Sequence, residues 1–112
     1  GLFFEYFEIN IIKKEKTQDE IVNSFLNEIT KDVIVNDQKL VKAGADSFLF
    51  SFYSIEYSEG IQFKNHIWYR ICVKDSKILI ASFVFSYKLK IKIIGEAYYN
   101  KINELIKSSE LN

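Results

Sequence analysis

The stretch SKILIASFVFSYKLKIKI, residues 76–93, decides the fold of this chain. Its odd positions from Leu79 to Ile93 are all apolar or aromatic, whereas its even positions change from mainly apolar residues to Ser and Lys along the run. Side chains on a strand alternate between its two faces. The pattern therefore predicts a long β-strand that is buried on both faces in its first half and on one face in its second half.

Two further strands precede this stretch. Residues 47–57 and 61–73 are rich in aromatic and β-branched side chains, which favour strands. Between them, Ser, Glu and Gly at residues 58–60 predict a three-residue hairpin loop, because Gly adopts a left-handed backbone conformation without strain. Together with residues 76–93, these segments predict an antiparallel meander of three long strands.

The turns of this meander also predict its register. If Tyr57 pairs with Ile61 and Val73 with Ile78, both faces of the sheet are apolar. One face then carries Phe48, Phe50, Phe52, His66, Trp68, Arg70, Ala81, Phe83 and Phe85. A sheet that is apolar on both sides needs a cover on each side. With two helices on one face, the other would need a second sheet layer, the N-terminal strand or a partner chain, so a homodimer is one option.

Helices are predicted near both ends of the chain. Thr17 and Glu20 have the spacing of a capping box, which predicts a helix over residues 17–31. A strand is predicted before it, at residues 2–12. A second helix is expected to begin near Gly95, because apolar residues recur after it at helical spacing.

The segment between the first helix and the meander contains Asn, Asp and Gln at residues 36–38, a turn-prone trio. It predicts a short hairpin or a bent strand. The whole chain, residues 1–112, is thus predicted to be a single α+β domain. Its antiparallel sheet contains the long three-strand meander, with one helix near the N-terminus and one C-terminal helix packed on the sheet.

Composition excludes several classes of protein. Fifteen Lys and Arg residues balance fifteen Asp and Glu residues, which argues against a nucleic-acid binder or a binder of anionic membranes. Cys72 is the only cysteine, so an intramolecular disulfide and a multi-cysteine zinc site are excluded. No apolar run approaches the roughly 20 residues of a membrane span, and residues 2–12 are too short and acidic for a secretory signal. We expect a cytoplasmic protein, or an exported one whose signal was removed.

Four residues with functional potential lie on one face of the strand at residues 61–73: His66, Trp68, Arg70 and Cys72. Trp and Arg are over-represented among interface hot spots, so Trp68, Arg70 and His66 are candidate contacts to a partner protein. The alternative is that Trp68 fills the core and that Arg70 stacks on Phe48 or extends to the edge of the sheet.

Charged residues provide a second group of candidates. Lys88, Lys90 and Lys92 would point the same way from one strand and suit an acidic partner or phosphate groups. The alternative is that lysines on an edge strand prevent aggregation. Glu59 in the predicted hairpin loop is a further candidate contact, although solvated acids are common at turns.

No catalytic residue is expected. The sequence has no nucleophile elbow, zinc-protease motif or glycine-rich phosphate loop. His66 and Cys72 are six residues apart, roughly 20 Å along an extended strand, so they cannot exchange a proton directly. No cofactor is expected, and no metal site, because no cluster with ligand spacing is present.

The order of these elements resembles the α+β sandwich of the PsbP/Mog1/DcrB-like group. The resemblance is carried by IWYRICVKDSKILIASFVF, residues 67–85, and by the closing segment INELIKSSEL, residues 102–111. It implies a non-enzymatic accessory or binding domain, and it carries no catalytic residue over to this chain.

Two functions follow as hypotheses. The first is a non-catalytic protein-interaction domain, either an accessory factor or an inhibitor such as a toxin-neutralising immunity protein. The second is a small-ligand-binding domain or weak enzyme, with a pocket between the sheet and the helices lined by Tyr53, Tyr69 and Tyr98.

Overall fold

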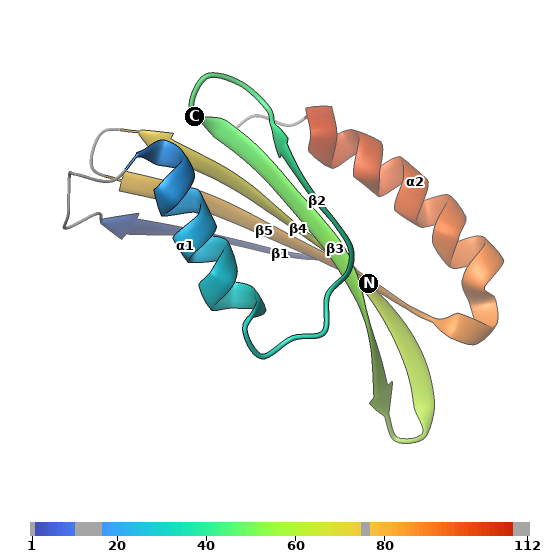
Figure 1. The fold of residues 1–112 in the computed structure, drawn as a ribbon. Coiled ribbons are helices and arrows are strands. Elements are labelled where there is room, and N and C mark those ends of the chain that lie inside the picture. Colours follow the sequence, from blue (N-terminus) through green and yellow to red (C-terminus); the bar gives the residue numbers. More distant parts are fainter. Residues whose placement is uncertain (1, 11–16, 75–76, 109–112) are drawn as a thin grey trace.

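The computed structural model describes residues 2–10, 17–74 and 77–108. These residues form one antiparallel sheet with the strand order β1-β5-β4-β3-β2, and two helices lie on opposite sides of it (Figure 1). In chain order the elements are β1 Leu2–Asn10, α1 Gln18–Thr30, β2 Asn36–Lys42, β3 Ser47–Ser58, β4 Ile61–Lys74, β5 Lys77–Lys88, the 3-10 helix η1 Leu89–Ile91, and α2 Lys92–Ser108. The predicted α+β class and the three-strand meander are confirmed.

Helix α1 begins where its capping residue predicts. The Thr17 hydroxyl accepts a hydrogen bond from the Glu20 N–H at 3.2 Å, which satisfies one of the free donors of the first turn. The inner side of α1 buries Val22 and Leu26 against the sheet. The core cluster on this side contains Val22, Leu26, Phe48, Phe50, Phe52, Ile71, Val73, Ile78 and Ile80.

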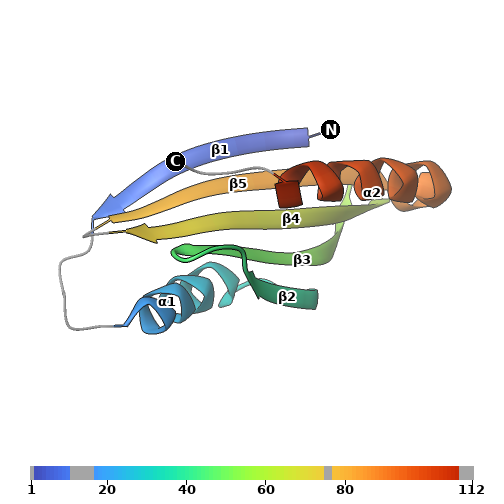
Figure 2. The same cartoon turned by 90° about the horizontal axis from the view of Figure 1, so that it is seen from above.

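Helix α2 covers the other face of the sheet. Its buried Ile106 packs with Leu49 and Trp68, and the half-buried side chains of Phe83, Phe85, Tyr99 and Ile102 complete this second cluster. Figure 2 shows the strands between the two helices. The prediction that the sheet needs two covers is therefore confirmed, and one helix supplies each. The reason given for a homodimer, an apolar sheet face without a cover, no longer holds.

The register between β3 and β4 differs from the prediction by one residue. Ser58 pairs with Ile61, so the turn contains only Glu59 and Gly60. Both have positive φ, 52° and 79°, as a two-residue hairpin turn of type I′ requires. The predicted pairing of Tyr57 with Ile61 is therefore wrong, because the predicted loop was one residue too long.

This slip moves the β3 side chains to the other face, because side chains alternate with period two. Phe48 lies opposite Ile71, and Phe50 lies opposite Tyr69. The phenylalanines of β3 therefore pack under α1 and not beside Trp68. Between β4 and β5 the prediction was correct, since Val73 pairs with Ile78.

Strand β2 is bent. Its pairing with β3 shifts between Asn36 and Lys39, and Asp37 within the shift has a φ of 52°. The Asn36 side chain donates a hydrogen bond to the Tyr53 carbonyl at 3.2 Å, which holds the start of the strand. Of the two predicted alternatives, the bent strand is the nearer one, but the strand begins at Asn36 and residues 33–35 are not part of it.

Strand β5 ends at Lys88, five residues earlier than predicted. The chain then turns through η1 into α2, and Gly95 packs against the Tyr87 ring. A Cβ at Gly95 would lie 2.3 Å from Cδ2 of Tyr87, so this close approach needs glycine. The alternating residues after Lys88 therefore do not continue the strand, and Ile91, Ile93 and Ile94 are exposed in η1 and the first turn of α2.

The remaining predictions fall at the ends of the chain. Strand β1 is confirmed through Asn10, while residues 11–12 of the predicted strand lie outside the described residues. Within the described part of the chain, no helix is both long and apolar enough to cross a bilayer.

Candidate functional site

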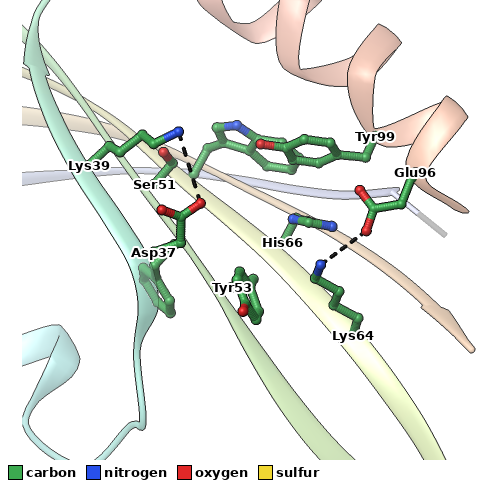
Figure 3. A pocket seen from close by; sticks show the side chains of 10 residues that line it. Asp37, Lys39, Ser51, Tyr53, Lys64, His66, Glu96 and Tyr99 are labelled. Carbon is green, nitrogen blue, oxygen red and sulfur yellow. Dashed lines mark hydrogen bonds and ion pairs between the residues drawn. The ribbon is translucent and has the colours of Figure 1, made fainter. Parts of the chain in front are cut away.

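A pocket of about 120 Å³ lies between the N-terminal half of α2 and the strands β2, β3 and β4 (Figure 3). It combines aromatic rings with charges of both signs. The residues that line it are Asp37, Lys39, Ser51, Phe52, Tyr53, Lys64, His66, Trp68, Glu96 and Tyr99.

The aromatic wall of the pocket joins α2 to β4. The Tyr99 ring lies 3.9 Å from the His66 ring and 5.6 Å from the Trp68 ring, between centroids, and is nearly parallel to Trp68. The Trp68 indole N–H donates to Asn103 Oδ1 at 3.0 Å. Because an indole donor is costly to bury without an acceptor, Asn103 fixes the position of Trp68 under the helix.

A chain of polar contacts forms one end of the pocket. Lys64 Nζ lies 3.0 Å from Glu96 Oε1 and 4.3 Å from the centroid of the Tyr53 ring. The Tyr87 hydroxyl donates to the same Glu96 oxygen. His66 Nε2 lies 3.2 Å from the Tyr87 hydroxyl oxygen. Since Tyr87 already donates to Glu96, we assign the proton of neutral His66 to Nε2, from which it is donated to Tyr87.

The burial of this network shifts its pKa values. Burial lowers the pKa of His66 to about 4, the Lys64 charge acts in the same direction, and Glu96 opposes them. Burial also raises the pKa of Tyr87, as does its hydrogen bond to Glu96. Burial alone would raise the pKa of Glu96, but the hydrogen bonds from Tyr87 and Lys64 lower it. At neutral pH, His66 is therefore an uncharged imidazole beside an ionised Glu96–Lys64 pair.

The other end of the pocket is open. Asp37 and Lys39 of β2 form a long ion pair of 4.0 Å, and both side chains are about two-thirds exposed. They face the pocket across the rings of Tyr53 and Tyr99 from the Lys64–Glu96 pair (Figure 3).

The predicted partner contacts on β4 are buried. Trp68 is 1% exposed, and His66 and Arg70 are each 5% exposed. The alternative that Trp68 fills the core is confirmed. The predicted stacking of Arg70 on Phe48 is wrong, because Arg70 pairs with Leu49 and shares its face, whereas Phe48 points to the opposite side.

The predicted row of lysines on one strand is wrong as well. Lys88 ends β5, Lys90 lies in η1, and Lys92 begins α2. Lys90 and Lys92 are nevertheless exposed. Glu59 is exposed in the turn of the β3–β4 hairpin, which projects away from both helices (Figure 1).

Of the three tyrosines predicted to line a pocket, only Tyr53 does so. Tyr69 packs against Phe25 of α1 on the opposite face, at 6.0 Å between centroids, and Tyr98 is exposed on α2. Tyr99 takes the predicted place of Tyr98. Its spacing of four from Gly95 and three from Ile102 gives the inner face of α2, a signal that the sequence does contain.

Among the described residues, no group of three or more His, Cys, Asp or Glu side chains could hold a metal ion. No family model matches the chain, and neither the curated proteins nor the solved structures give a significant match. The resemblance to the PsbP/Mog1/DcrB-like group stays a prediction, and any functional conclusion has to come from the geometry of the molecule.

Proposed function

We propose that this chain is a non-catalytic protein-interaction domain, an accessory or inhibitory protein that binds its partner through the outer face of α2. The observation that carries the proposal is a row of exposed apolar side chains on this helix. Ile94, Tyr98 and Leu105 are 59%, 57% and 69% exposed. Spacings of four and seven residues place all three on one side of the helix.

Helix α2 therefore has two apolar faces. The inner face, with Tyr99, Ile102 and Ile106, packs on the sheet. The outer face has no cover among the described residues, and the exposed Ile91 of η1 precedes it, whereas the exposed Ile93 lies on another side of the helix, about 100° from Ile94. An amphipathic helix of a monomeric protein needs one apolar face, and a large exposed apolar patch is typical of an interaction site.

The charges around this row favour an acidic partner. Lys101 lies between Tyr98 and Leu105 on the same side of the helix, and Lys90, Lys92 and Lys107 are exposed near its two ends. Of the two glutamates of α2, Glu96 is paired with Lys64. No acidic residue lies in the first turn of α2, where Lys92 opposes the helix dipole at a cost of about 0.3–1 kcal/mol. A positive charge at a position where it lowers stability supports a role in binding.

These features suit a partner that receives α2 in an apolar groove with an acidic rim, a common mode of helix recognition. A second copy of this chain suits them less well. Two α2 helices side by side would bring their Lys101 side chains together, and the 17-residue helix spans about 25 Å. Such a contact covers less than the roughly 800 Å² per partner of a standard interface.

The proposal can be tested by capture from lysate of the source cells with three immobilised forms of the protein. The outer-face variant carries Ile94→Ser, Tyr98→Ser and Leu105→Ser. The control carries Ile34→Ser, which removes an exposed apolar side chain, 82% exposed, away from α2. We expect one stoichiometric protein to be retained by the wild type and the control and lost from the outer-face variant. Equal retention by all three forms, or retention of a second copy of the chain only, would contradict the proposal.

A further inference from the structure

The pocket of Figure 3 has the same pair of opposite charges at each end. The Lys64–Glu96 pair closes its inner end, where the two side chains are 15% and 33% exposed, and the Asp37–Lys39 pair stands at its open end. With His66 neutral, the lining carries two positive and two negative charges. A lone cation would meet two lysines there, and a lone anion would meet two carboxylates.

Both ends of the pocket have charged groups that can still bind a ligand. At Glu96, the hydrogen bonds from Lys64 and Tyr87 end on the same oxygen, Oε1. Oε2 has no hydrogen-bond partner among the described residues, so it can bind a ligand ammonium group. At the other end the 4.0 Å separation of Asp37 Oδ2 and Lys39 Nζ is beyond hydrogen-bond distance. Both of these groups are thus able to bind a ligand of opposite charge.

The walls between these ends are aromatic. Tyr53 lies on one side and Tyr99 on the other (Figure 3), and Trp68 stacks against Tyr99. Rings of this kind attract ammonium groups through their negative faces, and the contact of Lys64 with Tyr53 already uses this attraction. The volume of about 120 Å³ is similar to that of cavities that accept molecules of about six heavy atoms.

From the paired charges, the aromatic walls and the volume, we propose that this pocket binds a small zwitterion, either an α-amino acid or a betaine. The ligand lies along the pocket with one charge at each end, between the aromatic walls. Its ammonium group faces Glu96 and its carboxylate faces Lys39, or, in the reverse orientation, the ammonium group faces Asp37 and the carboxylate faces Lys64. This site is separate from the outer face of α2, so it extends the proposed function to a domain that also binds a metabolite.

Trp68 makes a direct test possible, because it is the only tryptophan of the chain and forms part of the pocket wall. The purified protein is titrated with glycine, alanine and glycine betaine while tryptophan fluorescence and the melting temperature are recorded. Methylammonium, tetramethylammonium and acetate, which carry one charge each, are titrated in parallel. We expect saturable fluorescence changes and a rise in melting temperature with at least one zwitterion, and at least tenfold weaker binding of the single-charge compounds.

Two exposed positions provide the matching variants. Asp37→Asn and Lys39→Gln each remove the open-end contact of one ligand orientation. The variant that matches the orientation of the bound ligand should weaken zwitterion binding about tenfold, and neither variant should lower the melting temperature of the free protein. Lys101→Gln on the outer side of α2 is the control and should bind as the wild type does. A preference for amino acids over betaines, or the reverse, shows whether the pocket binds an ammonium group with N–H bonds or a fully methylated one.

Three results would overturn the proposal. The first is that no zwitterion changes the tryptophan fluorescence or the melting temperature at millimolar concentration. The second is equal binding of a single-charge compound and of the zwitterion that matches it. The third is unchanged binding in both pocket variants. None of these results depends on partner capture by α2, so the failure of one proposal can be told apart from the failure of the other.

Discussion

The two faces of the sheet are built from different kinds of side chain. Under α1, the buried core cluster contains only aliphatic residues and phenylalanine. Under α2, Trp68 is buried together with His66 and Arg70, and its indole N–H depends on a partner from the helix. Buried polar groups add little to stability and require specific partners. The comparison indicates that the α1 side mainly stabilises the fold, whereas the α2 side also forms a site.

Removing a core side chain from the α1 side should have the largest effect. Ile71 is fully buried there, so Ile71→Ala should lower the free energy of unfolding by about 2–5 kcal/mol. Urea denaturation measures this change. Ligand and partner binding by the remaining folded molecules should not change. A loss of less than about 1 kcal/mol would contradict the separation of roles between the two faces.

The contact between α2 and β5 gives the next largest effect. A Cβ at residue 95 would overlap the Tyr87 ring, so Gly95→Ala should destabilise the protein by about 1–3 kcal/mol despite the higher helix propensity of Ala. Asn100→Ala on the exposed side of the same helix is the control and should be neutral or slightly stabilising. Equal melting temperatures for the two variants would show that α2 does not pack on Tyr87 as described.

His66 should make stability on the α2 side depend on pH. Its pKa is about 4 when folded and near 6.5 when unfolded, so protonation favours the unfolded state. Its contribution is fully present above pH 6.5 and is lost as the pH falls toward 4. The expected slope in this range is about 1.4 kcal/mol per pH unit. Urea denaturation at several pH values should show this slope in the wild type and a flatter one in His66→Asn.

Because His66 is the only histidine, NMR titration of its ring protons gives the pKa directly. A pKa near 6.5 in the folded protein would contradict the burial of His66 under Tyr99. The lowered pKa of Glu96 acts in the same direction at more acidic pH, where its stabilising charge is lost.

The smallest expected effect concerns the charge at the start of α2. Lys92→Glu should raise the free energy of unfolding by about 0.5 kcal/mol, because an acidic residue suits the helix N-terminus. The same substitution should weaken partner binding. Lys107→Glu at the other end of the helix is the matched control, which should lower stability slightly. If Lys92→Glu leaves partner binding unchanged, the acidic rim assigned to the partner is wrong.

The sequence predicted the parts of the fold that depend on local signals. Thr17 marks the start of α1, and alternating apolar residues mark the meander strands. The register of β3 was missed because the two-residue turn requires a positive φ at Glu59. Glutamate does not predict this conformation. The end of β5 was missed because the alternation of apolar residues continues to Ile93, past the last residue of the strand.

The pocket could be predicted only in part. The sequence placed Tyr53 in it correctly, but the Lys64–Glu96 pair joins residues 32 positions apart on different elements. Their contact depends on how α2 crosses the end of β4, which no local pattern specifies. The sequence does contain the information to choose Tyr99 over Tyr98, because the seven-residue repeat of the inner face includes Tyr99 and not Tyr98.

These two neighbouring tyrosines provide the most direct test of the central claim, that α2 packs on the sheet with one face and binds a partner with the other. Partner capture and melting temperature are measured for Tyr98→Ser and Tyr99→Ser side by side. We predict that Tyr98→Ser loses the partner at an unchanged melting temperature, and that Tyr99→Ser melts at a lower temperature but still captures the partner when folded. Retention of the partner by Tyr98→Ser, or an equal loss of stability in both variants, would contradict the account.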